Sequence, residues 1–104
     1  MTIKSKIRAF KVQGGQEVVA EVVGTTEQMG STVSIKMRRP HILQFQQQRD
    51  GSVGLVFIPW TLSNPDIREL DVPISAILFS FETSAQVEKQ YLQQTSGIEI
   101  ATAM

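Results

Sequence analysis

The sequence predicts a small, mainly β barrel followed by a C-terminal helix, and two features of the chain support this fold class. Apolar and polar residues alternate on both sides of Gly14-Gly15, which is the strongest hairpin signal in the chain. Between Glu69 and Phe81 the apolar residues keep one parity and then change to the other. Because side chains of a strand alternate between two faces, this change predicts a sharp corner of the kind that small barrels need.

Length and composition limit the possible function classes. The chain has 104 residues, the size of one domain, and its ten basic and ten acidic residues cancel. A broad electrostatic attraction to nucleic acid or to an anionic membrane is therefore not expected. The absence of cysteine excludes disulfides, thiolate nucleophiles and cysteine-based zinc sites. No apolar run is long enough to cross a membrane, so we expect a soluble cytoplasmic protein without a membrane partner.

Strands are predicted from period-2 alternation and from the turn residues between them. Pro40 interrupts the third strand, and a bulge or bend is expected there because proline cannot donate to a ladder. Residues 24–32 are expected to form a loop, and Asp50-Gly51 a hairpin turn. After the corner, Ile77, Phe79 and Phe81 are expected to face the core. The predicted strands span residues 7–13, 16–24, 32–45, 53–62 and 69–81.

A helix is expected after the barrel. Ser84 is a candidate N-cap, and Gly97 would lie just past the C-terminal end. Val87 and Tyr91 are four residues apart and give the helix an apolar stripe that would pack on the barrel. The single domain therefore divides into a barrel at about residues 4–82, a helix at about 84–95 and a tail at 97–104.

No arrangement of residues suited to catalysis stands out. His41 is the only histidine, which excludes metal sites with several histidines and leaves one imidazole for acid-base work. The chain has no nucleophile elbow, no calcium-loop or HExxH spacing and no glycine-rich phosphate loop. We therefore expect no enzyme activity, no cofactor and no metal.

The best candidate for contacting nucleic acid is a basic cluster in the third predicted strand. Lys36, Arg38 and Arg39 lie close together, His41 follows them, and Lys11 could add a further cation. Such residues bind phosphate groups. The alternative is an ordinary solvated strand face, because neighbouring cations are common on strands and the net charge is zero.

Several short segments carry a resemblance to a known family. Residues 10–23 resemble the first motif of Sm and Sm-like proteins, and residues 69–81 resemble the second. Together with Arg39-Pro40, Ile58-Pro-Trp60 and the helix that starts at Ser84, nearly the whole chain is similar to small Sm-like proteins encoded by tailed phages, cyanophages among them. The resemblance implies a strongly bent five-stranded antiparallel barrel whose edge strands pair between subunits into a homo-oligomeric ring.

The resemblance also bears on partners. Family members usually bind RNA around the pore through an Asp-x-x-Asn loop and an Arg-Gly corner, but this chain has residues 27–30 (Glu-Gln-Met-Gly) and 73–75 (Pro-Ile-Ser) instead. Two hypotheses therefore remain: a ring that binds RNA in phage-infected cells, or a structural or adaptor ring that binds a phage or host protein. In either, an apolar surface would be covered by the neighbouring subunit, and its candidate residues are Val19, Val23, Ile58 and Trp60.

Overall fold

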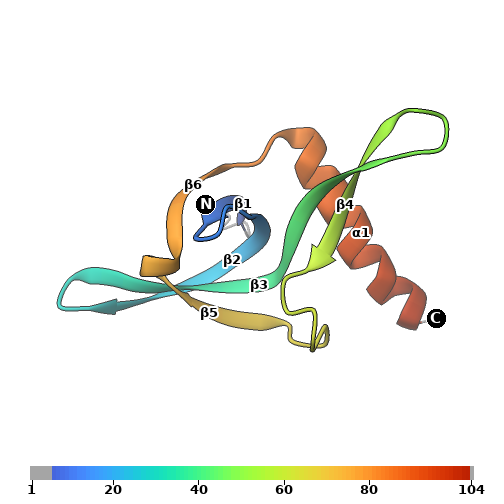
Figure 1. Ribbon diagram of the computed structural model, residues 1–104. Helices are drawn as coiled ribbons and strands as arrows, with labels where there is room; N and C mark the ends of the chain where they lie inside the picture. The colour runs from blue at the N-terminus through green and yellow to red at the C-terminus, as the bar shows by residue number, and fades with distance from the viewer. Residues whose placement is uncertain (1–5, 104) are drawn as a thin grey trace.

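One curled antiparallel sheet and one C-terminal helix make up the part of the chain that the structure describes (Figure 1). The computed structural model describes the backbone of residues 6–103 and the side chains of residues 7–95; residues 4 and 5 of the predicted barrel and residue 104 of the predicted tail lie outside the described part. The elements are β1 (Lys6–Val12), β2 (Glu17–Gln28), β3 (Ser31–Gln47), β4 (Val53–Pro59), β5 (Glu69–Pro73), the 3-10 turn η1 (Ile74–Ala76), β6 (Ile77–Glu82) and α1 (Ala85–Ala103).

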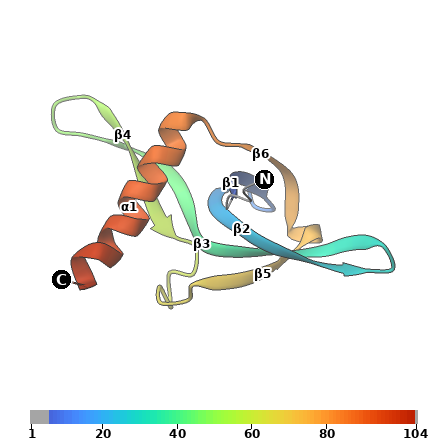
Figure 2. The same ribbon diagram turned by 180° about the vertical axis from the view of Figure 1, so that it is seen from behind.

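The long strand β3 organises the sheet. The strand order is β4-β3-β2-β1-β6, and β5 pairs with β3 outside this path. The first half of β3 lies between β2 and β5, and the second half pairs with β4. The sheet curls into half of a barrel, as the view from behind also shows (Figure 2). The prediction of a mainly β, strongly bent sheet with a C-terminal helix is confirmed.

The predicted corner divides one expected strand into two. Residues 74–76 form η1, which connects β5 to β6 along the chain and belongs to neither strand. The corner therefore lies where the parity change placed it, but the described sheet has six strands and not five. The reason is that a 3-10 turn makes local hydrogen bonds, so it ends one strand and begins another instead of bending it.

A bulge in β6 changes which side chains reach the core. Val12 pairs with Ile77, but Lys11 pairs with Phe79, so the one-residue step on β1 matches a two-residue step on β6. The extra residue moves Phe79 and Phe81 to the opposite face from Ile77. Ile77 packs against the buried cluster around Phe10 and Met37, as predicted. Phe79, in contrast, is 56% exposed and Phe81 is 37% exposed. The prediction that both phenylalanines face the core is wrong.

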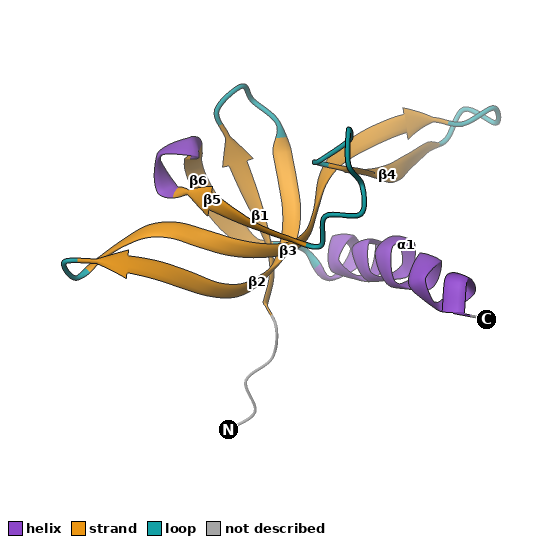
Figure 3. Cartoon of the chain, turned by 90° about the horizontal axis from the view of Figure 1, so that it is seen from below, coloured by secondary structure: helices purple, strands orange, loops and turns teal. Residues whose placement is uncertain are grey.

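Residues 24–32 form a β-ribbon and not the expected loop. Strand β2 continues to Gln28, β3 starts at Ser31, and Met29-Gly30 makes the turn with φ of 51° and 81°. Threonines in this segment are β-branched residues that fit an extended strand. The ribbon projects to one side of the molecule and the β3–β4 hairpin to the other (Figure 3).

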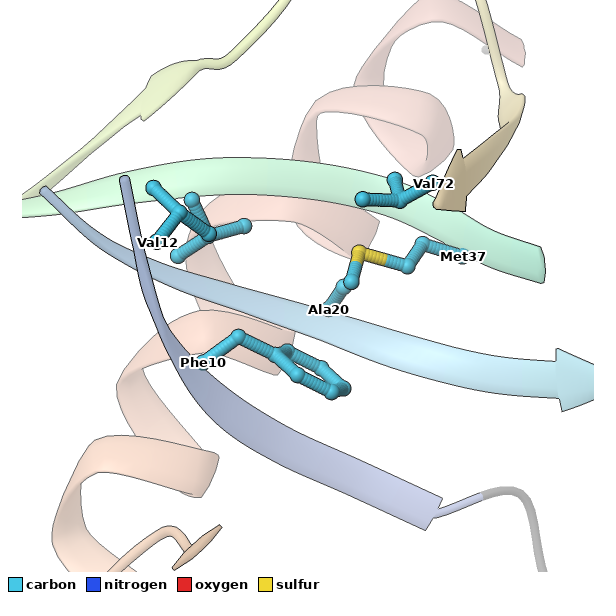
Figure 4. Close-up of a cluster of buried hydrophobic side chains, with 6 residues drawn as sticks. Phe10, Val12, Ala20, Met37 and Val72 are labelled. Atoms are coloured by element: carbon cyan, nitrogen blue, oxygen red, sulfur yellow. The ribbon is translucent and has the colours of Figure 1, made fainter. Parts of the chain in front are cut away.

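Apolar clusters lie on both faces of β1 and β2. In the inner cluster, side chains from β1, β2, β3 and β5 point into one space (Figure 4). The outer cluster lies beneath α1. The alternation of faces along β1 and β2 explains why consecutive residues are all buried. The inner cluster consists of Phe10, Val12, Val18, Ala20, Met37 and Val72, and the outer one of Ala9, Val19, Phe57 and Tyr91.

Helix α1 begins at its predicted cap and is fixed to β4. The Ser84 hydroxyl accepts a hydrogen bond from the Val87 backbone N–H at 3.2 Å. The Gln94 side chain donates to the Leu55 carbonyl at 2.9 Å and accepts from the Phe57 N–H at 3.3 Å, as a neighbouring strand would.

The helix is longer than predicted. It continues through Gly97 to Ala103, so the predicted end at about residue 95 is wrong. A single glycine costs a helix only about 1 kcal/mol, which is not enough to end it. Within the described residues, no helix is both long and apolar enough to cross a membrane.

Candidate nucleic-acid interface

A bulge in β3 brings the candidate arginines together. Glu21 pairs with Arg38 and Val19 pairs with His41, so β3 carries one more residue than β2 in this interval. The predicted irregularity at Pro40 is therefore confirmed as a bulge. Arg39 lies in it with a φ of 51°, a left-handed conformation that costs a non-glycine residue about 1 kcal/mol or more.

Three hydrogen bonds hold Arg39 in this conformation. Its backbone N–H donates to the Arg68 carbonyl at 2.7 Å, which ties the bulge to the segment that leads into β5. Its carbonyl accepts from the Tyr91 hydroxyl at 2.7 Å. The same carbonyl lies 2.8 Å from Nδ1 of His41, and because a carbonyl only accepts, Nδ1 carries the proton. Helix α1 thus helps to fix the bulge.

A buried carboxylate lies behind the arginines. Glu21 is only 6% exposed. Its Oε1 lies 3.7 Å from Nη1 of Arg38 and 3.5 Å from Nη2 of Arg39. These contacts offset the cost of removing the carboxylate from water. On the exposed side, Nη2 of Arg38 lies 3.2 Å from Oε2 of Glu69, its partner across the β3–β5 ladder.

Three arginines face one open cavity of about 360 Å³. Arg38, Arg39, Arg68 and Glu69 line it. The carboxylates of Glu21 and Glu69 lie against the guanidinium groups of Arg38 and Arg39. Planar guanidinium groups with several fixed N–H donors are well suited to phosphate oxygens. The site can therefore bind an anion, although part of its charge is already balanced.

The predicted basic residues are only partly brought together. Arg38, Arg39 and His41 meet at the bulge. Lys36 is exposed beside them and pairs across the ladder with Asp71. Lys11 instead lines a separate groove and pairs across β1–β2 with Glu17. The basic cluster is thus divided into one pocket and two cations that lie opposite acidic residues.

His41 supports the bulge and is not an additional cation at neutral pH. Burial lowers its pKa from the ordinary value, the positive charge of Arg39 lowers it further, and the hydrogen bond to the Arg39 carbonyl acts in the opposite direction. The edge of the ring lies against Tyr91, with centroids 6.0 Å apart. Burial raises the pKa of the Tyr91 hydroxyl, which therefore remains a donor.

The sequence alone did not identify Arg68, Glu21, Glu69 or Tyr91 as part of this site. A signal for Glu69 was present, since positions 36 and 38 are basic and positions 69 and 71 are acidic. Opposite charges at period-2 spacing are typical of neighbouring strands. No comparable signal existed for Arg68, because its place depends on the backbone bond to Arg39.

A larger groove of about 660 Å³, lined by both apolar and polar residues, lies between the β1–β2 turn, the β3–β4 hairpin and the start of α1. Phe45 is 75% exposed at its hairpin wall, where Leu43, Val53 and Leu55 also lie. The first residue of β4, Val53, is 62% exposed, because α1 packs against the later part of the strand, at Leu55 and Phe57.

The four predicted interface residues lie in different environments. Val19 is completely buried in the outer cluster, so it has no surface left to offer a neighbouring subunit. Val23 and Ile58 are partly exposed. Trp60 packs against the inner cluster, and its backbone N–H donates to the Pro40 carbonyl at 2.9 Å.

Strand β6 carries apolar side chains that are more exposed than the four predicted interface residues. Leu78, Phe79 and Phe81 lie there at the surface. The two phenylalanine rings lie side by side, with centroids 5.9 Å apart.

Among the described residues, no three His, Asp or Glu side chains gather as they would to hold a metal ion. Comparison with known proteins adds no assignment: the sequence matches no protein-family model, and no curated protein is significantly similar to it.

Proposed function

We propose that this chain is a non-catalytic Sm-like protein of tailed-phage origin that assembles into a homo-oligomeric ring and binds RNA in the cytoplasm of the infected cell. The order of its motifs and the curled half-barrel sheet support the family assignment. The meeting of Arg38, Arg39 and Arg68 around one open cavity is the observation that carries the RNA-binding role.

The edges of the sheet support ring assembly. In the described part of the chain, β5 pairs only with β3 and β6 only with β1. Strand β4 is a further edge, because it also pairs only with β3. A free edge strand presents unpaired N–H and C=O groups, and pairing β5 of one subunit with β6 of the next would satisfy two of these edges at once. The apolar side chains of Leu78 and Phe79 on β6 would then be covered by the neighbour.

Light scattering at micromolar concentration tests the ring. We expect a defined oligomer for the natural chain and a shift toward monomer for Phe79→Asp. Phe45→Asp is the matched control, because Phe45 is also an exposed aromatic residue but lies on the hairpin away from β5 and β6. A stable monomer of the natural chain would refute assembly, and equal effects of both variants would refute the β6 interface.

Repetition in a ring would strengthen a weak anion site. In one pocket Glu21 and Glu69 balance part of the positive charge, but each subunit adds the same pocket to the assembly, so several phosphates of one strand can be bound together. When binding is through phosphates, the logarithm of the binding constant falls linearly with the logarithm of the salt concentration, and the number of phosphate contacts sets the slope.

Fluorescence anisotropy with a single-stranded RNA at several salt concentrations tests the site. We expect binding that weakens steeply with salt, and Arg68→Ala should reduce both the affinity and the salt slope. Arg49→Ala is the control, because Arg49 is an exposed arginine in the β3–β4 turn. If a confirmed ring binds no RNA at low salt, or if Arg49→Ala has the larger effect, the proposal is wrong.

The second candidate is a structural or adaptor ring that binds a phage or host protein. The larger groove with the exposed Phe45 favours it, as does the partial neutralisation of Arg38 by Glu69 and Glu21. Capture from infected-cell lysate with and without nuclease separates the two functions. Protein partners that survive nuclease and are lost with Phe45→Asp would support the adaptor.

A further inference from the structure

We propose that the Arg38–Arg39–Arg68 pocket binds the terminal phosphate group of an RNA strand in preference to an internal phosphate. This inference rests on the proposed RNA-binding function and names the part of the RNA that the pocket would take. A terminal phosphate monoester carries about 1.5 to 2 negative charges at neutral pH, whereas each internal phosphodiester carries one.

The distribution of charge favours a single group over a continuous strand. A strand bound along its backbone needs cations spaced along a groove. Here Lys11 lies in a different groove, opposite Glu17 in the β1–β2 ladder, and Lys36 lies opposite Asp71 in the β3–β5 ladder. A strand that followed β3 and β5 would therefore pass the carboxylates of β5. A group that enters the cavity from solvent meets a wall to which Arg38, Arg39 and Arg68 all contribute.

The pocket is also organised before any ligand arrives. Arg39 is held in its left-handed conformation by Tyr91 and His41, and its N–H fixes the backbone of Arg68 at 2.7 Å. Strained residues that the surrounding structure holds in place are concentrated at ligand sites. A preorganised site loses less conformational entropy on binding. The backbone hydrogen bond thus positions Arg39 and Arg68 relative to each other.

The two carboxylates of the site have different places. Glu21 is buried behind Arg38 and Arg39, where it fixes the guanidinium groups. Glu69 lies at the cavity wall and shares Arg38. A ligand must compete with Glu69 for the Nη2 donor, and a dianion competes better than a monoanion. The site therefore discriminates in favour of the group with the greater charge.

Fluorescence anisotropy with one labelled RNA 10-mer, prepared with a 5′-phosphate, a 3′-phosphate or only hydroxyl ends, tests the inference. The label is internal, so that both ends are free. We expect one phosphorylated form to bind at least about tenfold more tightly than the hydroxyl form, which corresponds to a charge-assisted hydrogen bond or two. Adenosine monophosphate is the competitor that distinguishes an RNA end from a free nucleotide.

Three variants sharpen the test. Arg68→Ala should remove the preference for the phosphorylated end, and Arg49→Ala, outside the pocket, should keep it. Glu69→Gln removes the competing charge and should raise the affinity for the phosphorylated RNA several-fold, a gain that loss of structure would not produce. Circular dichroism checks that each variant remains folded.

The outcomes separate the two proposals. Equal binding of all three RNA forms would overturn the terminal-phosphate inference while RNA binding stands. Binding of the phosphorylated RNA no tighter than that of adenosine monophosphate would overturn RNA as the source of the phosphate. Absence of binding by every form would overturn both proposals. A lower affinity of Glu69→Gln for the phosphorylated RNA would overturn the inference that Glu69 competes with the ligand for Arg38.

Discussion

Ile77 and Phe79 have the same parity in the sequence but opposite environments, and replacing each with aspartate tests the bulge in β6. Ile77 packs against the inner cluster, whereas Phe79 is 56% exposed on the other face. Truncating a buried isoleucine typically costs about 2–5 kcal/mol, and placing a carboxylate there adds a further penalty. Because Ile77 is only partly buried, we expect Ile77→Asp to lower the free energy of unfolding by about 3–4 kcal/mol.

For Phe79→Asp we expect a loss of about 1 kcal/mol or less, because an exposed ring loses little apolar burial. In a domain of this size, 1 kcal/mol corresponds to about 4–8 °C in Tm, so the melting temperatures of the two variants should differ by about 8 °C or more. Urea unfolding is followed by the fluorescence of Trp60, the single tryptophan, which packs against the inner cluster.

Assembly must be separated from folding in this experiment. A ring raises the apparent stability in a concentration-dependent way. The unfolding of each variant is therefore measured at two protein concentrations, and the free energies of unfolding are compared under conditions where they no longer depend on concentration. If Phe79→Asp costs as much as Ile77→Asp under these conditions, the bulge is wrong and both side chains face the core.

Three further predictions follow from the bulge in β3 and the β1–β2 turn. Tyr91→Phe removes the donor to the Arg39 carbonyl and should cost about 1–2 kcal/mol of stability by urea unfolding; no change would mean that His41 alone holds the carbonyl. The lowered pKa of His41 means that the unfolded imidazole, with a pKa of about 6.5, takes up a proton before the folded one. Stability should therefore be constant above about pH 6.5 and decrease below it, more steeply than in His41→Asn, and parallel curves would contradict this. Gly15→Ala should lower Tm, because φ is 88° and the cost is backbone strain of about 1 kcal/mol or more, with nothing within 4 Å of the added Cβ; an unchanged Tm would contradict the turn geometry.

The elements that the sequence identified correctly are those governed by local rules. Gly14-Gly15, Asp50-Gly51 and Ser84 have the conformational or capping properties that their positions require, and each lies where it was expected. The errors come from places where local signals were weak. The threonines of residues 24–32 were assigned to a loop, yet pairing of two such segments with each other makes a ribbon.

The candidate site shows the same division. Arg38, Arg39 and His41 could be found because they are close in sequence and lie beside a proline. Arg68 and Glu21 could not, because the first is brought by a backbone hydrogen bond and the second by cross-strand pairing. Lys11 was grouped with the others by charge alone, and the sheet places it in another groove.

The sequence by itself determined that this protein is a mainly β domain with a corner near Ser75 and a capped helix after it, because alternation, turn residues and caps act over a few neighbouring residues. Only the tertiary structure decided which face of β6 is buried, since one bulged residue reverses every side chain after it. It also decided which charges meet. Arg38 faces Glu21 and Glu69 across two ladders, so the balance of the basic cluster depends on pairing partners that lie far away in the chain.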